Sequence, residues 1–407
     1  MLNDMQICDI AQKYGTPSYL FDLSELSSRV KRIKELLGEE VELCYAMKAN
    51  PFLTFFLDEY VDKFEVCSFG EYEICKKYEI CSSKIVYSGV YKQCDELMNT
   101  VKDDFDGDYT IESKKQFEEL CNLIHETKRH ARILLRLTSG NQFGMDEEEI
   151  IAILSRIDEM PYIEFAGIQF FSGTQKKNIE IVERELTELD AFCTKVKIET
   201  GKVITRIEYG AGLFVDYFGD EEADFDDLIK MREWLQKRQY HFVIELGRYI
   251  VATCGKYLTK IVDIKKNKGK RYCMIDGGIH QINYYGQMLG LRVPPVRQVS
   301  YERKQIGESE KWTVCGALCT VHDVVLREYE MQNPCEGDLL LFEMIGAYSV
   351  TEASFLFLSR ELPNVLAIDE KGQVKVLRKQ MSTAHINSGG ETRKPVKKLL
   401  GVVDIYG

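Results

Sequence analysis

The chain has 407 residues, of which 45% are hydrophobic and 29% are charged, as in an ordinary folded globular protein. This length exceeds the size at which one hydrophobic core stops growing, so we expect one large domain and a smaller one. The formal net charge of −12 argues against nucleic acid or an anionic membrane as the main partner. No leader with basic and apolar parts begins the chain and no apolar run is long enough to span a bilayer, so we expect a cytoplasmic protein.

The cysteines fit that expectation, because thirteen of them are scattered along the chain without a pairing pattern. Several lie inside apolar segments, as Cys273 does, and are typical of small buried hydrophobic residues. Cys315, Cys319 and His322 lie close together, but a zinc site needs a fourth ligand that the sequence does not offer nearby. We therefore predict no metal.

The first part of the chain alternates between strands and helices. A turn and a short apolar strand over 15–22 precede a helix whose apolar residues recur at helical spacing until Gly38. Eight strand candidates, each followed by a polar helical stretch, come next at 41–47, 63–67, 84–88, 109–112, 133–137, 166–171, 204–209 and 242–245. The alternation has no interruption that would mark a switch point, so the pattern predicts a (β/α)8 barrel of the TIM type rather than a doubly wound sheet.

After residue 251 the pattern changes to strands separated by short turns, with few helical repeats. These strand candidates are 257–264, 272–275, 312–314, 321–328, 339–342 and 374–377. We therefore predict a barrel over 23–255 and a mostly β domain built from 1–22 and 256–380. Residues 381–407 are polar and weakly patterned, which predicts a C-terminal tail of low order.

Lys48 follows the first barrel strand, just before Asn50 and Pro51 break that strand. In such barrels, active sites gather at the carboxyl ends of the strands. A partly desolvated lysine there has a lowered pKa and can form a Schiff base with a carbonyl compound. From this stretch alone, an ordinary surface lysine is the more common interpretation.

Polar and glycine-rich residues also end the other strands. They include Glu65, Ser88, Glu112, Arg136, Phe171 to Gln175, Gly210 to Gly212 and Glu245 to Arg248. The glycine loops can offer backbone N–H groups to a phosphate, and Arg248 can add a charged fork. A buried guanidinium such as Arg136 needs a partner, and Glu71 and Glu245 are candidates to hold either Arg136 or a cofactor. A purely structural salt bridge is the alternative for both.

The segment from Tyr45 to Asn50 resembles the cofactor-lysine motif of the pyridoxal phosphate-dependent decarboxylases of diaminopimelate, ornithine and arginine. This family shares the alanine-racemase type of barrel and second β domain. The resemblance continues in order through 64–71, 87–89, 142–145, 173–175, 245–248, 276–278, 319–323 and 346–348. It covers nearly the whole chain apart from the tail, which makes coincidence an inadequate explanation.

The resemblance implies a cofactor, pyridoxal 5'-phosphate, bound through a Schiff base on Lys48. Glu245 would face the pyridine nitrogen and keep the ring protonated, so that the ring accepts the electron pair left by CO2. Alanine racemases place an arginine there, so Glu245 favours decarboxylation over the alternative, a racemase or epimerase. The implied cofactor-binding residues are Lys48, Glu65, Arg136, Phe171, Thr174, Gly210, Gly212, Glu245, Gly247, Arg248 and Tyr348.

The resemblance also implies a homodimer with two shared active sites. Cys319 would reach the active site of the partner subunit and protonate the carbanionic intermediate. An inert core cysteine is the alternative. A small vitamin-binding homologue of the barrel is a non-catalytic alternative, but such a protein has no use for Cys319 or Tyr348.

Departures from the family pattern concern the substrate. Phe171 replaces the usual stacking histidine. Diaminopimelate decarboxylases carry a glutamate directly after the cysteine, where this chain has Thr320, and an arginine that is absent from 280–285. Diaminopimelate is therefore a poorer match, although it stays an alternative. We predict that the substrate site includes Thr320, Asp323, His280 and Tyr284, with ordinary loop surface as the alternative for each.

The same combination of residues resembles the specialised-metabolism branch of the family. One member of that branch decarboxylates glutamate tethered to a carrier protein. The sequence thus predicts an α-decarboxylase of an amino acid or amino-acid derivative, which arrives either free or bound to a carrier.

Overall fold

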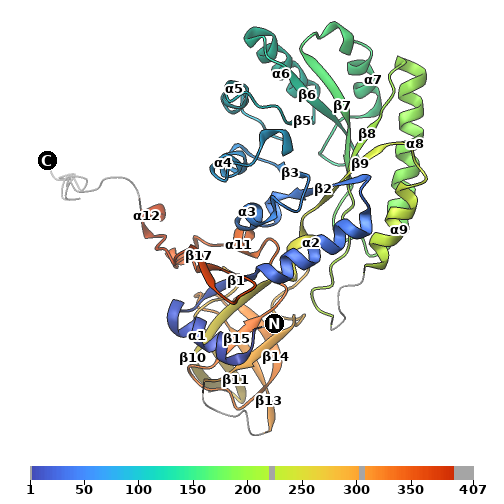
Figure 1. The fold of residues 1–407 in the computed structure, drawn as a ribbon. Helices are drawn as coiled ribbons and strands as arrows, with labels where there is room; N and C mark the ends of the chain where they lie inside the picture. The colour runs from blue at the N-terminus through green and yellow to red at the C-terminus, as the bar shows by residue number, and fades with distance from the viewer. Residues whose placement is uncertain (1, 220–224, 302–307, 389–407) are drawn as a thin grey trace, which may run out of the picture.

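The structure is a computed structural model that describes residues 2–219, 225–301 and 308–388. It contains a barrel wrapped by helices and, beside it, a domain made mostly of strands (Figure 1). Among the described residues, no helix is long and apolar enough to cross a bilayer.

Eight parallel strands form a closed barrel, in which the last strand pairs with the first. They are β2 (Val41–Ala46), β3 (Lys63–Val66), β4 (Ile85–Tyr87), β5 (Asp108–Ile111), β6 (Ala131–Leu137), β7 (Ile163–Phe171), β8 (Arg206–Gly210) and β9 (His241–Leu246). Each lies where the sequence predicts a strand, so the barrel is confirmed. All eight carboxyl ends therefore open onto one rim.

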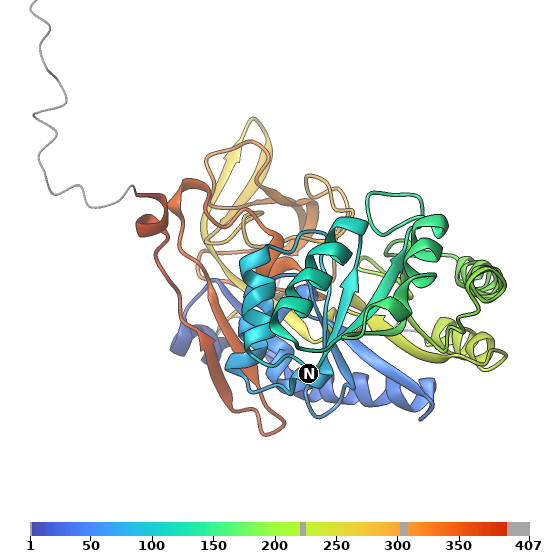
Figure 2. The same ribbon diagram turned by 90° about the horizontal axis from the view of Figure 1, so that it is seen from above.

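Helices surround the barrel, and Figure 2 shows their arrangement from above. The longer ones are α2 (Leu23–Leu37), α4 (Phe69–Lys77), α5 (Cys94–Lys102), α6 (Lys114–Thr127), α7 (Glu147–Leu154), α8 (Glu180–Thr200) and α9 (Asp226–Leu235). In α2, Asp22 caps the amino end by accepting hydrogen bonds from two backbone N–H groups. The apolar face of α2, which includes Leu26, Val30 and Ile33, is buried.

The second domain is a nine-stranded sheet with the order β14-β13-β11-β10-β1-β16-β17, to which β12 and β15 pair from the side. The strands are β1 (Ser18–Asp22), β10 (Gly255–Asn267), β11 (Lys270–Ile275), β12 (Val296–Val299), β13 (Ser309–Cys315), β14 (Val324–Gln332), β15 (Leu339–Phe342), β16 (Asn364–Ile368) and β17 (Val374–Arg378). Because β1 lies between β10 and β16, the start of the chain belongs to this sheet. The exact boundary at residue 255 stays a prediction.

Several elements of this domain have no counterpart in the sequence prediction. Among them are α1 (Asp4–Tyr14), β12 and β16. The two strands have four and five residues, and their places depend on pairing with β15 and with β1, which lie far away in the chain. Local alternation alone does not reveal such strands.

The stretch that the sequence assigns to the tail begins with ordered residues. Met381 pairs with Leu362, and the buried Thr383 donates a hydrogen bond to the carbonyl of Arg360, just before the short helix α12 (Ala384–Asn387). The rest of the predicted tail, from residue 389, lies outside the described residues.

Candidate active site

One cavity of about 320 Å³ opens at the carboxyl rim of the barrel, a size that suits a small ligand. Every residue that the sequence predicts for the cofactor lines it: Lys48, Glu65, Arg136, Phe171, Thr174, Gly210, Gly212, Glu245, Gly247, Arg248 and Tyr348. These residues come from the ends of six barrel strands and from one loop of the β domain. The fold therefore gathers them, although they are spread over 300 positions of the sequence.

Lys48 lies in the short turn η1 (Met47–Ala49) directly after β2. Its Nζ is 2.6 Å from the Glu65 carboxylate and 3.6 Å from the sulfur of Cys67. The Lys48 side chain is 40% exposed and faces the cavity, whereas Glu65 is buried. The amine is thus held in place by a buried acid and remains accessible to a ligand.

The protonation of Lys48 differs from the sequence expectation. Burial is the largest single influence and lowers the pKa of Lys48, but the surrounding negative charges, that of Glu65 foremost, and the hydrogen bond to Glu65 together outweigh it, so the pKa lies well above its ordinary value. Correspondingly, burial is the largest influence on Glu65 and raises its pKa, but the charge and hydrogen bond of Lys48, together with the charge of Arg136, bring the pKa below its ordinary value. Lys48 is therefore an ammonium group paired with Glu65, and it must lose a proton before it can attack a carbonyl.

Glu245 lies on β9 and is only 7% exposed. Its Oε1 accepts a 3.0 Å hydrogen bond from the amide of Gln169 on β7. Burial raises the pKa of Glu245, and the charge of Glu65 adds to the rise. A cationic group placed opposite Glu245 would reverse this, because an opposite charge stabilises the carboxylate.

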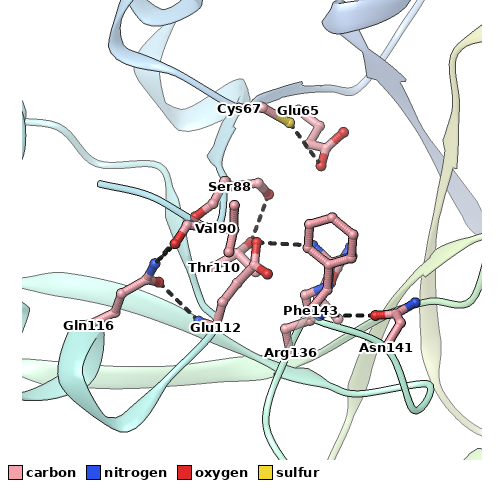
Figure 3. Close-up of polar contacts among 12 residues, drawn as sticks. Glu65, Cys67, Ser88, Val90, Thr110, Glu112, Gln116, Arg136, Asn141 and Phe143 are labelled. Carbon is pink, nitrogen blue, oxygen red and sulfur yellow. Dashed lines mark hydrogen bonds and ion pairs between the residues drawn. The ribbon is translucent and has the colours of Figure 1, made fainter. Parts of the chain in front are cut away.

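Arg136 pairs with Glu112, at 3.0 Å, across the neighbouring strands β5 and β6 (Figure 3). The ring of Phe143 lies over the guanidinium, with 4.8 Å between the guanidinium carbon and the ring centre. Neither carboxylate that the sequence suggests pairs with Arg136, since Glu71 accepts a hydrogen bond from the backbone of Cys67 and Glu245 accepts one from Gln169. As partners of Arg136 both were wrong, because the adjacent strand supplies a closer carboxylate, whereas their role toward a cofactor stays a prediction.

Two glycine loops meet at the side of the cavity where β7 and β8 end. Gly212 has a φ of +60°, and a Cβ there would lie 2.0 Å from the carbonyl oxygen of Gly173. A Cβ on Gly210 would lie 2.5 Å from the ring of Phe171. Only glycine allows the two loops to approach this closely, and backbone N–H groups in such loops suit a phosphate.

Arg248 begins the short helix α10 (Arg248–Val251) beside these loops. One of its Nη atoms donates to the hydroxyl of Tyr217 at 2.6 Å, and its guanidinium lies 4.5 Å from the ring centre of Tyr348. Its buried Nε has no hydrogen-bond partner among the described residues. The site therefore has a cation with a free donor, which is what an anionic ligand would use.

The β domain closes one side of the cavity. The backbone N–H of Tyr348 donates to Ala49 at 2.7 Å, and the side-chain amide of Asn50 donates to Gly346 at 2.8 Å. Both bonds join a β-domain loop to the turn that carries Lys48. Tyr348 has a φ of +68°, an unfavourable conformation for tyrosine that these contacts hold in place.

The predicted proton donor and substrate residues lie outside this cavity. Cys319 is exposed in the loop between β13 and β14, and Thr320 lies next to it. Both carboxylate oxygens of Asp323 accept backbone hydrogen bonds, from Ile279 at 2.9 Å and from Leu318 at 2.7 Å. Asp323 therefore fixes the loop that carries Cys319.

His280 and Tyr284 are both buried. Burial, with the charge of Arg360, lowers the pKa of His280 to about 4, so the imidazole is neutral at pH 7. The hydroxyl of Tyr284 donates to the carbonyl of Glu343 at 2.5 Å. Within a single chain, the structure does not bring either residue to Lys48.

The cavity also contains residues that the sequence interpretation did not assign to the site. They include Cys67, Phe143, Gln169 and Leu213, and also Glu112, which the sequence placed at a strand end without a role. Gln169 could have been found, because it is a polar residue near the end of a predicted barrel strand. Phe143 lies in a loop whose course only the structure shows.

Comparison with protein families gives a match over residues 23–252, which is more than half of the chain. The matching family is described as the pyridoxal-dependent decarboxylases, and the matched part as their pyridoxal binding domain. It coincides with the barrel and includes most of the residues that line the cavity.

Similar proteins cover almost the full length. The chain is 25% identical to the L-glutamyl-BtrI acyl-carrier protein decarboxylase of Niallia circulans, over 93% of this chain and 94% of that protein. It is 27% identical to a diaminopimelate decarboxylase of Methanocaldococcus jannaschii, over 89% of both. A crystal structure of diaminopimelate decarboxylase from M. jannaschii superposes with a TM-score of 0.83 at 23% identity, over 95% of this chain and 94% of that one.

Proposed function

The chain belongs to the pyridoxal-dependent decarboxylases, and from that premise we propose that it removes the α-carboxylate of an amino acid or amino-acid derivative carried by an acyl-carrier protein. Enzymes of this family act with pyridoxal phosphate on amino-acid substrates. The observation that supports α-decarboxylation here is the placement of Glu245 in the cavity that holds Lys48. A carboxylate there suits the strong electron acceptor that loss of CO2 requires.

The residues of the cavity fit this cofactor. The glycine loops and the free Nε of Arg248 suit its phosphate, Lys48 its aldehyde and Glu245 its ring nitrogen. When bound, pyridoxal phosphate supplies the electron sink for the bonding pair that CO2 leaves behind. Glu65 orients the Lys48 amine and is the nearest group that can accept its proton, at 2.6 Å.

We assign to Cys319 of a partner subunit the role of donating a proton to the α-carbon that has lost CO2. Two observations support this. Cys319 is exposed on a loop that Asp323 holds in place, and it does not line the cavity of its own chain. A head-to-tail dimer would give each cavity a thiol, and each subunit would need the other for turnover. Thr320, next in the chain, would then lie beside the substrate.

The substrate is the finer part of the proposal. Thr320 is uncharged, and 280–285 contains no arginine that would bind a distal carboxylate. Among the matched proteins, the decarboxylase of N. circulans is named for a glutamyl group on a carrier protein. A substrate whose far end is linked to a carrier has no free distal charge, which agrees with an uncharged pocket.

Diaminopimelate decarboxylation is the second candidate. Its support is the similarity to the enzyme of M. jannaschii, at 27% identity. Against it are the same two features, since a free distal amine and carboxylate would lack charged partners. A racemase has less support still, because the family and the carboxylate at position 245 both favour loss of CO2.

A CO2-release assay tests the proposal. Purified enzyme loaded with pyridoxal phosphate is given carrier-bound aminoacyl thioesters, free amino acids and diaminopimelate in parallel. We expect CO2 from a carrier-bound substrate, and none from the Lys48→Ala variant, while the surface variant Lys195→Ala keeps full activity. Release from diaminopimelate alone would select the second candidate, and α-carbon deuterium exchange without CO2 would contradict decarboxylation.

A further inference from the structure

A second buried carboxylate lies in the barrel below Glu245. Glu208 is on β8 and is fully buried. It comes two residues before Gly210, which is the register partner of Glu245, so Glu208 lies one step deeper into the barrel. Because Glu208 and Glu245 are diagonal neighbours on the same face of the paired strands β8 and β9, their side chains are close enough for the two carboxyl groups to interact.

Among the residues that the structure describes, Arg206 is the one cation that pairs with Glu208. Its Oε2 accepts a 3.0 Å hydrogen bond from Arg206, but the same guanidinium also donates to Asp108, at 2.7 Å. Asp108 has two further cations nearby, Lys63 at 3.6 Å and Arg132 at 3.4 Å. The other oxygen of Glu208, Oε1, receives no hydrogen bond from any described donor.

Two ionised carboxylates in contact inside a protein repel each other strongly, and pairs of this kind share one proton. Burial, with the charge of Glu245, holds the pKa of Glu208 well above its usual range. Burial raises the pKa of Glu245 as well, but the hydrogen bonds from Glu208 and Gln169 oppose that rise. Glu245 lines the cavity that also holds the Lys48 amine, whereas Glu208 is fully buried and one of its oxygens has no partner among the described residues, so the proton belongs on Glu208.

We propose that Glu208 is a positioning residue that stays protonated and donates a hydrogen bond to Glu245. The pair then carries one negative charge, located on Glu245 at the floor of the cavity. Gln169 at 3.0 Å and Glu208 would together fix the orientation of that carboxylate. The inference rests on the proposed function, because it assigns Glu245 to the ring nitrogen of the cofactor.

Infrared spectroscopy of the holoenzyme at neutral pH tests the protonation directly. We expect the carbonyl stretch of a protonated carboxyl group in the wild type and its loss in Glu208→Gln. Glu112→Gln is the control, since Glu112 is ion-paired with Arg136 and should contribute no such band. An unchanged band in Glu208→Gln would overturn the proposal.

Two variants test the positioning role. Glu208→Gln keeps a donor of the same length, so cofactor affinity and kcat should stay within about threefold of wild type. Glu208→Leu removes the donor, and we expect both to fall about tenfold to a hundredfold, the typical value of one hydrogen bond to a charged group. Equal losses in both variants would overturn the role.

If Glu208→Leu fails to fold, Glu208→Gln and the infrared band still decide the question. Failure of the proposed function looks different. A wild-type protein that cannot take up pyridoxal phosphate would contradict the assignment of the cavity, whereas the carboxyl band of Glu208 can be measured without the cofactor.

Discussion

The barrel rim and the Cys319 loop differ in whether a single chain contains all the residues that each one needs for its proposed role. The rim gathers the whole predicted cofactor site, with an amine, a buried carboxylate, glycine loops and an arginine around one cavity. The Cys319 loop is also held in place, by Asp323. Its thiol is exposed, however, and does not line the cavity that contains Lys48 in the same chain. The comparison agrees with our proposal that one chain binds the cofactor, while turnover needs a second copy.

The largest expected effect on the rim comes from replacing Glu245. We predict that Glu245→Leu lowers kcat about 10³-fold, because it removes a preorganised charge from the reacting ring. The cofactor should still attach to Lys48, which absorbance of the bound cofactor would show. A variant with normal kcat would remove the basis for α-decarboxylation.

On the loop, we predict that Cys319→Ala lowers kcat about 10²-fold or more, the usual contribution of a positioned acid. Cofactor affinity should not change, because the residues that we assign to the cofactor all line the cavity of the chain itself and none lies on the Cys319 loop. Cys335→Ala, which alters another partly exposed cysteine of the β domain, is the matched control. Loss of cofactor affinity in Cys319→Ala would contradict the division between the two regions.

A smaller effect is expected from the ion pair that lines the cavity. Glu112→Gln leaves Arg136 without its buried counter-charge, which costs about 3 kcal/mol of stability. Thermal unfolding would measure this loss. The comparison variant Arg156→Gln breaks an exposed pair with Glu159 and should change stability by less than about 1 kcal/mol.

The smallest effect concerns His280 beside the Cys319 loop. Its folded pKa, about 4, lies below the ordinary value for histidine, so the unfolded chain binds more protons between these two values. The contribution of the neutral, buried His280 to stability is therefore fully present above about pH 6.5 and is lost as the pH falls toward 4. We predict that His280→Gln reduces this acid loss by about 2 kcal/mol, measured by denaturant unfolding at pH 7 and pH 4.5. Parallel pH curves for the two proteins would contradict it.

The sequence predicted the rim well because local information determines it. Strand alternation located all eight barrel strands, and a parallel barrel places every strand end on one side. The roles of Lys48 and Glu245 were implied by the resemblance of the motifs at those ends to a known family, and these roles stay predictions.

Pairings between side chains were harder to predict. The sequence expectation of a lowered lysine pKa considered burial alone, whereas the surrounding acidic groups, led by Glu65 at 2.6 Å, together reverse the sign of the shift. The partner of Arg136 depended on which strand end lies closest. Glu208 attracted no attention because a carboxylate inside a strand is usually on the exposed face, and only the structure shows that it is buried against Glu245.

Complementation between two inactive variants tests the central claim most directly. Lys48→Ala retains Cys319, and Cys319→Ala retains Lys48, so a mixed dimer regains one complete site. An equal mixture should recover about a quarter of the wild-type activity, since about half of its dimers are mixed and each has one working site. A mixture that dissociates, exchanges subunits and still shows no activity would contradict the claim that each cavity is completed by the partner's thiol.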